Sequence, residues 1–370
     1  MNGLVIVANG MDYRNDWISL PNMIQSFLKD DVLQIWIPGG RFAKSKLPGT
    51  VDNINQLLAQ YPNTKELVID YSHEIIPQLA CTTDVDSLTM LDNINCNNIT
   101  IFYGDINVGK NINYNFQKNI NFLGVNYFEW RHRQQIECHC VPELEYRRNF
   151  DQICSRKFTN LIGVVKSHRI YLASELYKQG YFDKGYTSCV TIINHSDSGK
   201  TVQSENEHKK DYFYVQDIQD RFNQLLPHFE VADIEVMDRG DASQNNSTPL
   251  NWFSDSYFNI VCETCFSNDW PYNELFITEK TFKPIIHQIP FIVAGSAGTL
   301  EYLKSIGYET FPEIFDESYD NEPNSYKRMA MIIEQIKSAC DDPELHNKVY
   351  NIQDKLKHNR NQYFDNTCLK

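Results

Sequence analysis

This sequence of 370 residues lacks the long apolar segments of membrane proteins. No run of about eighteen apolar residues occurs, so the sequence predicts no transmembrane helix. No basic segment followed by an apolar run stands at the start, so it predicts no signal peptide either. We therefore expect a soluble cytoplasmic protein, or one of the host cytoplasm if its source is a virus.

The sequence also lacks two chemical signatures. No Gly-x-Gly-x-x-Gly follows the first strand predicted in either half, which disfavours a nucleotide-sugar epimerase or dehydrogenase. Ten cysteines are scattered without the spacing of a disulfide framework. The tightest cluster, Cys138 and Cys140 with His132 nearby, lacks the Cys-x-x-Cys loop of structural zinc sites. We expect reduced cysteines, no metal site and no resident cofactor.

Positive charge is scarce. Lys and Arg number 34 against 48 Asp and Glu, which gives a net charge of −14 and disfavours nonspecific binding to nucleic acid over the whole surface. A local basic face remains possible. Hydrophobic residues make up 42% of the chain and aromatic residues 13%, as in a globular protein with room for two domains.

Short β-branched runs alternate with amphipathic segments along the chain. This pattern predicts an α/β fold whose mostly parallel sheets carry helices on their faces. A polar stretch at 142–157 suggests a boundary. The prediction is an N-terminal Rossmann-like acceptor domain, a C-terminal donor domain and a final helix, over residues 1–155, 156–345 and 346–370. Strands are expected at 4–8, 32–37, 66–69, 99–102, 122–128, 160–165, 257–262 and 290–293.

The most informative stretch begins at Thr278-Glu279-Lys280. Glu279 can accept hydrogen bonds from sugar or ribose hydroxyls, while Lys280 and Lys283 can offset phosphate charge. An apolar strand follows and ends in a small-residue turn at 295–298, and ligands of open α/β sheets bind at such strand ends. The alternative is an ordinary helix start with solvated charges.

Two further strand ends carry charged residues. Lys166-Ser167-His168-Arg169 follows the strand at 160–165 and would place cations and helix amides together as an anion site. Taken alone, this segment favours an ordinary exposed turn. Glu263 follows the strand at 257–262. In the first half, Asp12, Asp105 and Glu129 also follow predicted strands.

These signals, in this order over about 160–310, resemble the donor domain of the α-1,3-fucosyltransferase-like glycosyltransferases. The resemblance implies two facing Rossmann-like domains of the GT-B type with a nucleotide sugar in the cleft. It implies that Arg169 and Lys280 contact the pyrophosphate, that Glu279 holds hydroxyls and that Glu263 faces the donor sugar. The family has Asn after this Glu, whereas this chain has Thr264, so the identity of the donor sugar stays open.

The predicted reaction is transfer of a hexose or pentose from a nucleotide-diphosphate sugar to an acceptor hydroxyl. The family resemblance implies inversion without a metal, with a carboxylate base from the first domain. Asp12, Asp105 and Glu129 are the candidates, and we favour Glu129 because aromatic and basic side chains adjoin it. Lys166, Thr278 and Lys283 complete the predicted donor site.

The acceptor is expected to be a glycan, with two alternatives. A hydroxymethylated base of phage DNA would require a basic face, and six residues could form one: Arg131, Arg133, Arg147, Arg148, Arg156 and Lys157. The other alternative is a non-catalytic nucleotide-sugar-binding protein that has lost its base.

Overall fold

The computed structural model describes residues 4–6, 33–38, 47–60, 62–71, 91–107, 115–126, 129, 132–133, 145–163, 165–189, 213, 215–230, 249–266 and 275–365. Contacts divide the chain into two compact units. Unit 1 comprises Met1–Trp130 with Asn366–Lys370, and unit 2 comprises Arg131–Asp365. Each unit contains a parallel sheet, so the predicted α/β class is confirmed.

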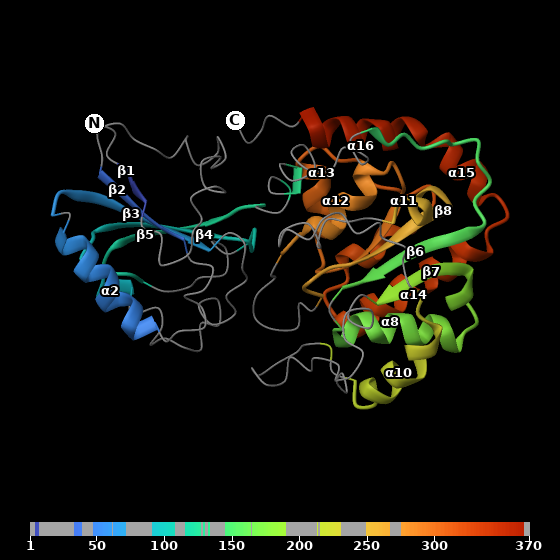
Figure 1. Cartoon of the computed structure of the whole chain (residues 1–370), viewed down its shortest axis with the longest axis horizontal. Coiled ribbons are helices and arrows are strands. Elements are labelled where there is room, and N and C mark those ends of the chain that lie inside the picture. Colours follow the sequence, from blue (N-terminus) through green and yellow to red (C-terminus); the bar gives the residue numbers. More distant parts are fainter. Residues whose placement is uncertain are drawn as a thin grey trace. The chain divides into compact units, whose positions relative to one another are not determined.

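Unit 1 has a five-stranded sheet whose strands follow one another in chain order, all parallel. The strands are β1 (Leu4–Ile6), β2 (Leu33–Pro38), β3 (Thr64–Tyr71), β4 (Asn98–Tyr103) and β5 (Asn119–Gly124). Helix α2 (Leu47–Gln60) lies along this sheet (Figure 1). It buries Val51, Ile54 and Leu58, which helical periodicity places on one face.

Unit 2 has a four-stranded parallel sheet in the order β7-β6-β8-β9. Its strands are β6 (Arg156–Ile162), β7 (Gly185–Cys189), β8 (Ser256–Cys262) and β9 (Phe291–Ala294). All residues of β8 and β9 are buried, as expected for parallel strands covered by helices on both faces.

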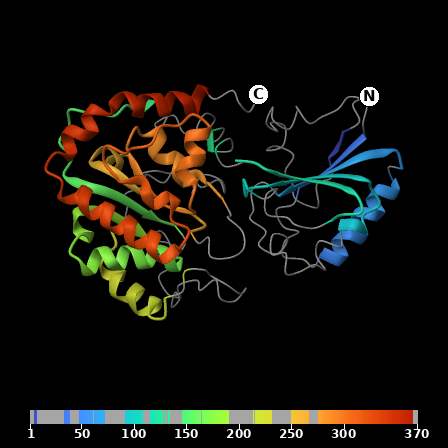
Figure 2. The same cartoon turned by 180° about the vertical axis from the view of Figure 1, so that it is seen from behind.

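Helices cover both faces of this sheet. On one face lie α8 (Ser167–Lys178), α10 (Ile218–Leu225) and α14 (Ser325–Asp341), and on the other lie α12 (Glu279–Ile286) and α16 (Gln353–Asp365) (Figure 1). The view from behind shows the same two layers (Figure 2). Shorter elements complete the unit: η2 (Phe182–Lys184), η4 (Leu226–His228), α11 (Leu250–Ser254), α13 (Thr299–Ser305), η5 (Glu317–Asn321) and α15 (Leu345–Asn351).

The unit boundary lies at 130/131, earlier than the predicted 155. Arg148 gives one reason, because its guanidinium donates to the carbonyls of Phe253 at 3.0 Å and Ser256 at 2.6 Å, which ties this segment to β8. Where the sequence predicts one final helix from residue 346, the described residues form two helices, α15 and α16, separated at Ile352, which is buried. Residues 346–365 also belong to unit 2, because α16 packs against α12.

Strand β7 was not expected from the sequence, because it is short and polar. Gly185 at its start lies against the ring of Phe158 on β6, and a Cβ there would stand 2.3 Å from that ring. Packing against the ring of Phe158 therefore favours a glycine at this position. Among the described helices, none has the length and apolar content needed to span a membrane.

Candidate functional site

The sheet of unit 2 reverses its strand order between β6 and β8. The chain passes from β6 outward to β7 and then returns to place β8 on the opposite side of β6. Ligands of open α/β sheets bind at such a reversal, beyond the carboxyl ends of the two strands. Here those ends are Ile162 and Cys262, so the following segments form the candidate site.

Helix α8 starts just beyond the end of β6. Lys166 occupies the N-cap position, and its side chain does not cap the helix. Ser167, His168 and Arg169 therefore form the first helical turn, where the sequence suggested a turn, and all three are buried. The first amides of a helix carry partial positive charge and favour an anion.

Two cations of this segment reach across to the end of β8. Lys166 donates from Nζ to the carbonyl of Thr264 at 3.0 Å, and Arg169 donates from Nη2 to the carbonyl of Glu263 at 2.9 Å. The two side chains are thus held at the reversal point of the sheet.

His168 lies beside both cations. Burial, reinforced by the charges of Arg169 and Lys166, lowers the pKa of His168 well below its usual value. The ring is therefore neutral, and Nε2 carries the hydrogen because its partner at 3.0 Å is the carbonyl oxygen of Glu263. The same ring stacks on Phe266, with centroids 5.4 Å apart.

The carboxylate of Glu263 is surrounded by donors within the protein. Oε1 accepts from Thr278 N at 3.0 Å and Thr281 Oγ1 at 2.6 Å, and Oε2 accepts from Thr264 N at 3.1 Å and Thr278 Oγ1 at 2.6 Å. Glu263 is 1% exposed. The resemblance implied that this side chain faces the donor sugar. Its hydrogen bonds instead fix the start of α12 against the end of β8.

Helix α12 presents the next pair of charges. Lys280 Nζ lies 2.6 Å from Glu279 Oε1 and 3.1 Å from Thr278 Oγ1. Burial acts to raise the pKa of Glu279, but the charges of Lys280 and Lys283 outweigh it and lower the pKa to about 2. Glu279 is therefore ionised at neutral pH and can accept, but not donate, hydrogen bonds, which suits the O–H donor of a hydroxyl group.

The cations of α8 and α12 lie around the same strand end. Burial raises the pKa of the Cys262 thiol to about 12, while the charges of Arg169 and Lys280 both act to lower it. Their hydrogen bonds show the same placement: Arg169 donates to the carbonyl of Glu263, and Lys280 Nζ lies 3.1 Å from Thr278 Oγ1, which donates to the Glu263 carboxylate. The charge of Lys283 acts instead on Glu279 and on the buried ring of His132, so Lys283 supports Glu279 one turn along α12. We call Lys166, Arg169, Lys280 and the start of α8 the switch-point site.

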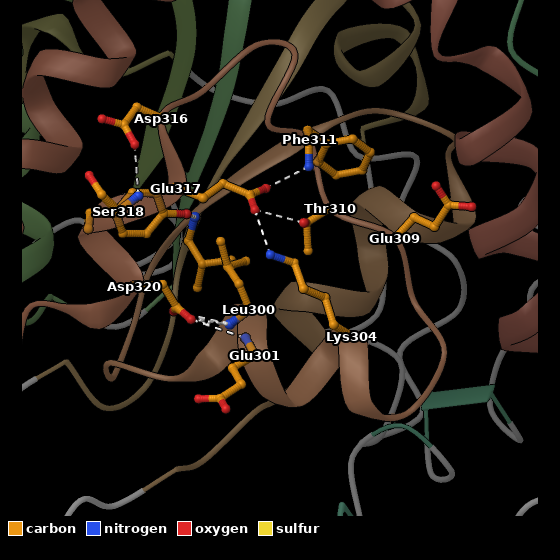
Figure 3. Close-up of polar contacts among 12 residues, drawn as sticks. Leu300, Glu301, Lys304, Glu309, Thr310, Phe311, Asp316, Glu317, Ser318 and Asp320 are labelled. Atoms are coloured by element: carbon orange, nitrogen blue, oxygen red, sulfur yellow. Dashed lines mark hydrogen bonds and ion pairs between the residues drawn. The ribbon is translucent and has the colours of Figure 1, made fainter.

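The small-residue turn at 295–298, expected to bind a ligand, leads into a helix start that a carboxylate already occupies. Asp320 accepts from the amides of Leu300, at 3.0 Å, and Glu301, at 3.1 Å (Figure 3). Its carbonyl accepts from the amide of Gly298 at 2.8 Å. Burial raises the pKa of Asp320. The backbone amides at the start of α13, which could otherwise hold a phosphate, therefore already donate to Asp320.

Unit 1 holds two of the three predicted base candidates among its described residues. Asp105 is 2% exposed and accepts from the amide of Asn107 at 2.9 Å. Gly124 makes room for this loop, since a Cβ there would lie 2.6 Å from the Asp105 carbonyl. Glu129 is 4% exposed and accepts from Asn126 Nδ2 at 3.1 Å.

Asp12 lies outside the described residues. Glu129 and Asp105 therefore remain the candidates whose surroundings are known. The roles of all three as bases stay predictions.

The predicted basic cluster is partly committed to internal contacts. Arg148 is 8% exposed and bonds to backbone carbonyls of unit 2. Arg156 donates to the carbonyl of Asp183 at 2.7 Å, and Lys157 lies over the ring of Tyr257. These contacts disfavour a continuous basic face for DNA.

Reasoning from the sequence did not single out Thr281 or Phe266. Thr281 could have been found from its spacing, because it lies three residues after Thr278 and so shares a helix face with it. Phe266 gives no such local signal, because only the folding of β8 beside α8 brings it to His168.

Among the described residues, no group of three or more His, Cys, Asp or Glu side chains is arranged to hold a metal ion.

No protein-family model matches the chain, and comparisons with curated proteins and with solved structures found no match either. The resemblance to fucosyltransferase-like enzymes therefore rests on the quoted residues alone.

Proposed function

We propose that unit 2 binds the diphosphate of a nucleotide sugar at the switch-point site and that the chain is a glycosyltransferase. One observation carries the proposal: Lys166, Arg169 and Lys280 come from two separate helix starts and lie around one end of β8, Lys280 through its contact with Thr278, which donates to Glu263. Such an arrangement of cations with a helix N-terminus suits a diphosphate.

The residues divide the work at the donor end. Arg169 and Lys280 hold the two phosphates, with Lys166 beside them, and so stabilise the negative charge that develops on the leaving diphosphate. Glu279, ionised and acceptor-only, holds ribose or sugar hydroxyls. Glu263 and Thr278 position the start of α12, and Lys283 keeps Glu279 charged.

The reaction follows the division of labour of the GT-B type, with the donor on unit 2 and the base on unit 1. Glu129 takes the proton from the acceptor hydroxyl, whose oxygen then attacks the anomeric carbon. The new bond forms as the bond from that carbon to the diphosphate oxygen breaks, which inverts the anomeric centre. No metal is required in this scheme because the cations offset the charge of the diphosphate.

We infer that the acceptor is a glycan rather than a hydroxymethylated base in DNA. The internal contacts of Arg148, Arg156 and Lys157 support this choice, since those side chains serve the fold of unit 2. DNA carrying hydroxymethylated bases nevertheless belongs in the same transfer assay, because transfer to it would reverse this inference.

Binding tests the donor end. Lys280→Met should weaken the binding of a nucleoside diphosphate at least tenfold in calorimetry, because one cation is removed. Lys304→Met is the matched control, since Lys304 on α13 also pairs with a glutamate, Glu317 at 2.8 Å, but lies outside the site. Equal effects of the two variants, or no binding by the wild type, would sink the proposal.

Turnover tests the base. Glu129→Gln should abolish sugar transfer and keep donor binding, while Glu66→Gln on β3 should keep both. Release of nucleoside diphosphate is measured with and without oligosaccharide acceptors. Nucleotide-sugar binding without release for any acceptor would instead identify a non-catalytic binding protein.

A further inference from the structure

A chain of aromatic rings extends from the switch-point site towards solvent. His168 stacks on Phe266, Phe266 meets Phe213 edge to face at 5.3 Å, and Phe213 stacks on Tyr326 at 4.9 Å with an interplanar angle of 26°. We call these four rings the aromatic ladder. It begins at the side chain next to Arg169 and ends on the first turn of α14.

The exposure of the rings changes sharply along the ladder. Phe266 and Phe213 are 2% and 1% exposed, whereas Tyr326 is 47% exposed. The stacking on Phe213 holds this large, partly exposed ring in one orientation.

A buried arginine on the same helix fixes the backbone near the end of the ladder. Arg328, two residues after Tyr326, is 1% exposed and donates to the carbonyls of Gly295, Glu322 and Phe266. Its guanidinium lies 4.7 Å over the Phe266 ring. One buried cation thus joins the start of α14 to the ends of β8 and β9, which makes the Tyr326 ring a rigid support.

We propose that Tyr326 is the stacking platform for the base of the nucleotide whose diphosphate occupies the switch-point site. This inference rests on the proposed function and names the part of the donor that the cations do not recognise. Every nucleobase has a flat π face, and stacking on an aromatic side chain is favourable without hydrogen bonds to the base. A platform of this kind prefers nucleotides to free pyrophosphate without strongly selecting among bases.

The test compares a nucleoside diphosphate, either uridine or guanosine diphosphate, with inorganic pyrophosphate, which has the two phosphates but no base. Tyr326→Ala should weaken nucleoside diphosphate binding about tenfold or more and leave pyrophosphate binding unchanged. Tyr326→Phe should bind both ligands like the wild type, because the ring remains. Tyr350→Ala on α15 is the matched control, since Tyr350 is 42% exposed and lies outside the ladder.

The outcomes separate this inference from the proposed function. If Tyr326→Ala and Tyr350→Ala bind nucleoside diphosphate equally well, the platform is refuted while the diphosphate site stands. If Tyr326→Ala weakens both ligands alike, the residue acts on the fold of the site and the platform is again refuted. If the wild type binds neither ligand, the proposed function fails first.

Discussion

The carboxylate of Glu263 gives the sharpest test of how the site is built. Each of its two oxygens accepts one backbone N–H and one threonine hydroxyl, from Thr264, Thr278 and Thr281. In Glu263→Gln one oxygen becomes an NH2 group. A hydroxyl can rotate to accept from that group, but a backbone N–H cannot, so either amide orientation leaves one buried N–H facing another donor.

The expected cost follows from this geometry. A buried donor left without an acceptor costs about 1–3 kcal/mol, and the remaining bonds lose the strength that a charged acceptor confers. We expect Glu263→Gln to destabilise unit 2 by about 3 kcal/mol, measured by urea unfolding. Nucleoside diphosphate binding should weaken as well, because the start of α12 is no longer fixed.

Thr281→Val is the graded control for this experiment. It removes one hydroxyl donor from Oε1 and keeps the charge of Glu263 with three donors. The loss should be about 1 kcal/mol, clearly smaller than for Glu263→Gln. A Glu263→Gln protein within about 0.5 kcal/mol of the wild type would refute the reasoning.

Three other perturbations have defined outcomes. The pKa of Glu279 is about 2 in the folded protein, below the value of 4.5 in the unfolded chain, so the stability that this carboxylate contributes is complete above about pH 4.5 and is lost as the pH falls through about 2. The expected loss is about 3 kcal/mol. The urea unfolding free energy of Glu279→Gln should therefore depend less on pH than that of the wild type. Gly185→Ala should lower the melting temperature, because the added Cβ would overlap the Phe158 ring. Gly163→Ala is the control, since a Cβ there meets nothing within 4 Å. Equal melting temperatures of the two variants would contradict the prediction for Gly185. Asp320→Asn should destabilise by about 1–2 kcal/mol in urea, because a neutral amide replaces the carboxylate at the start of α13; an unchanged midpoint would count against that capping role.

Local sequence patterns were sufficient for several elements. The β-branched runs predicted β3, β4, β8 and β9 within a few residues, because buried parallel strands need continuous apolar segments. The apolar stripe of α14, which includes Met329, Ile332 and Ile336, has the spacing that identifies a helix from sequence alone. Strand β7 was missed because its short polar sequence depends on the ring of Phe158 across the sheet.

The candidate site shows the same division. Spacing alone placed Thr278, Glu279 and Lys280 at a helix start, and Thr278 is indeed the N-cap of α12. Spacing could not show that both carboxylate oxygens of Glu263 would accept hydrogen bonds from the threonines that follow. Nor could it show that Asp320, far from Leu300 along the chain, would occupy the start of α13.

The α/β class, and the placement of the charged site residues after strands, follow from the sequence alone, because periodicity and chain order are local properties. Which of those strand ends lie together depends on the fold of the whole sheet. The order β7-β6-β8-β9 brings α8 beside the end of β8, so that Lys166 and Arg169 reach the carbonyls after Cys262. Strand order depends on packing across the whole sheet, which no local pattern contains.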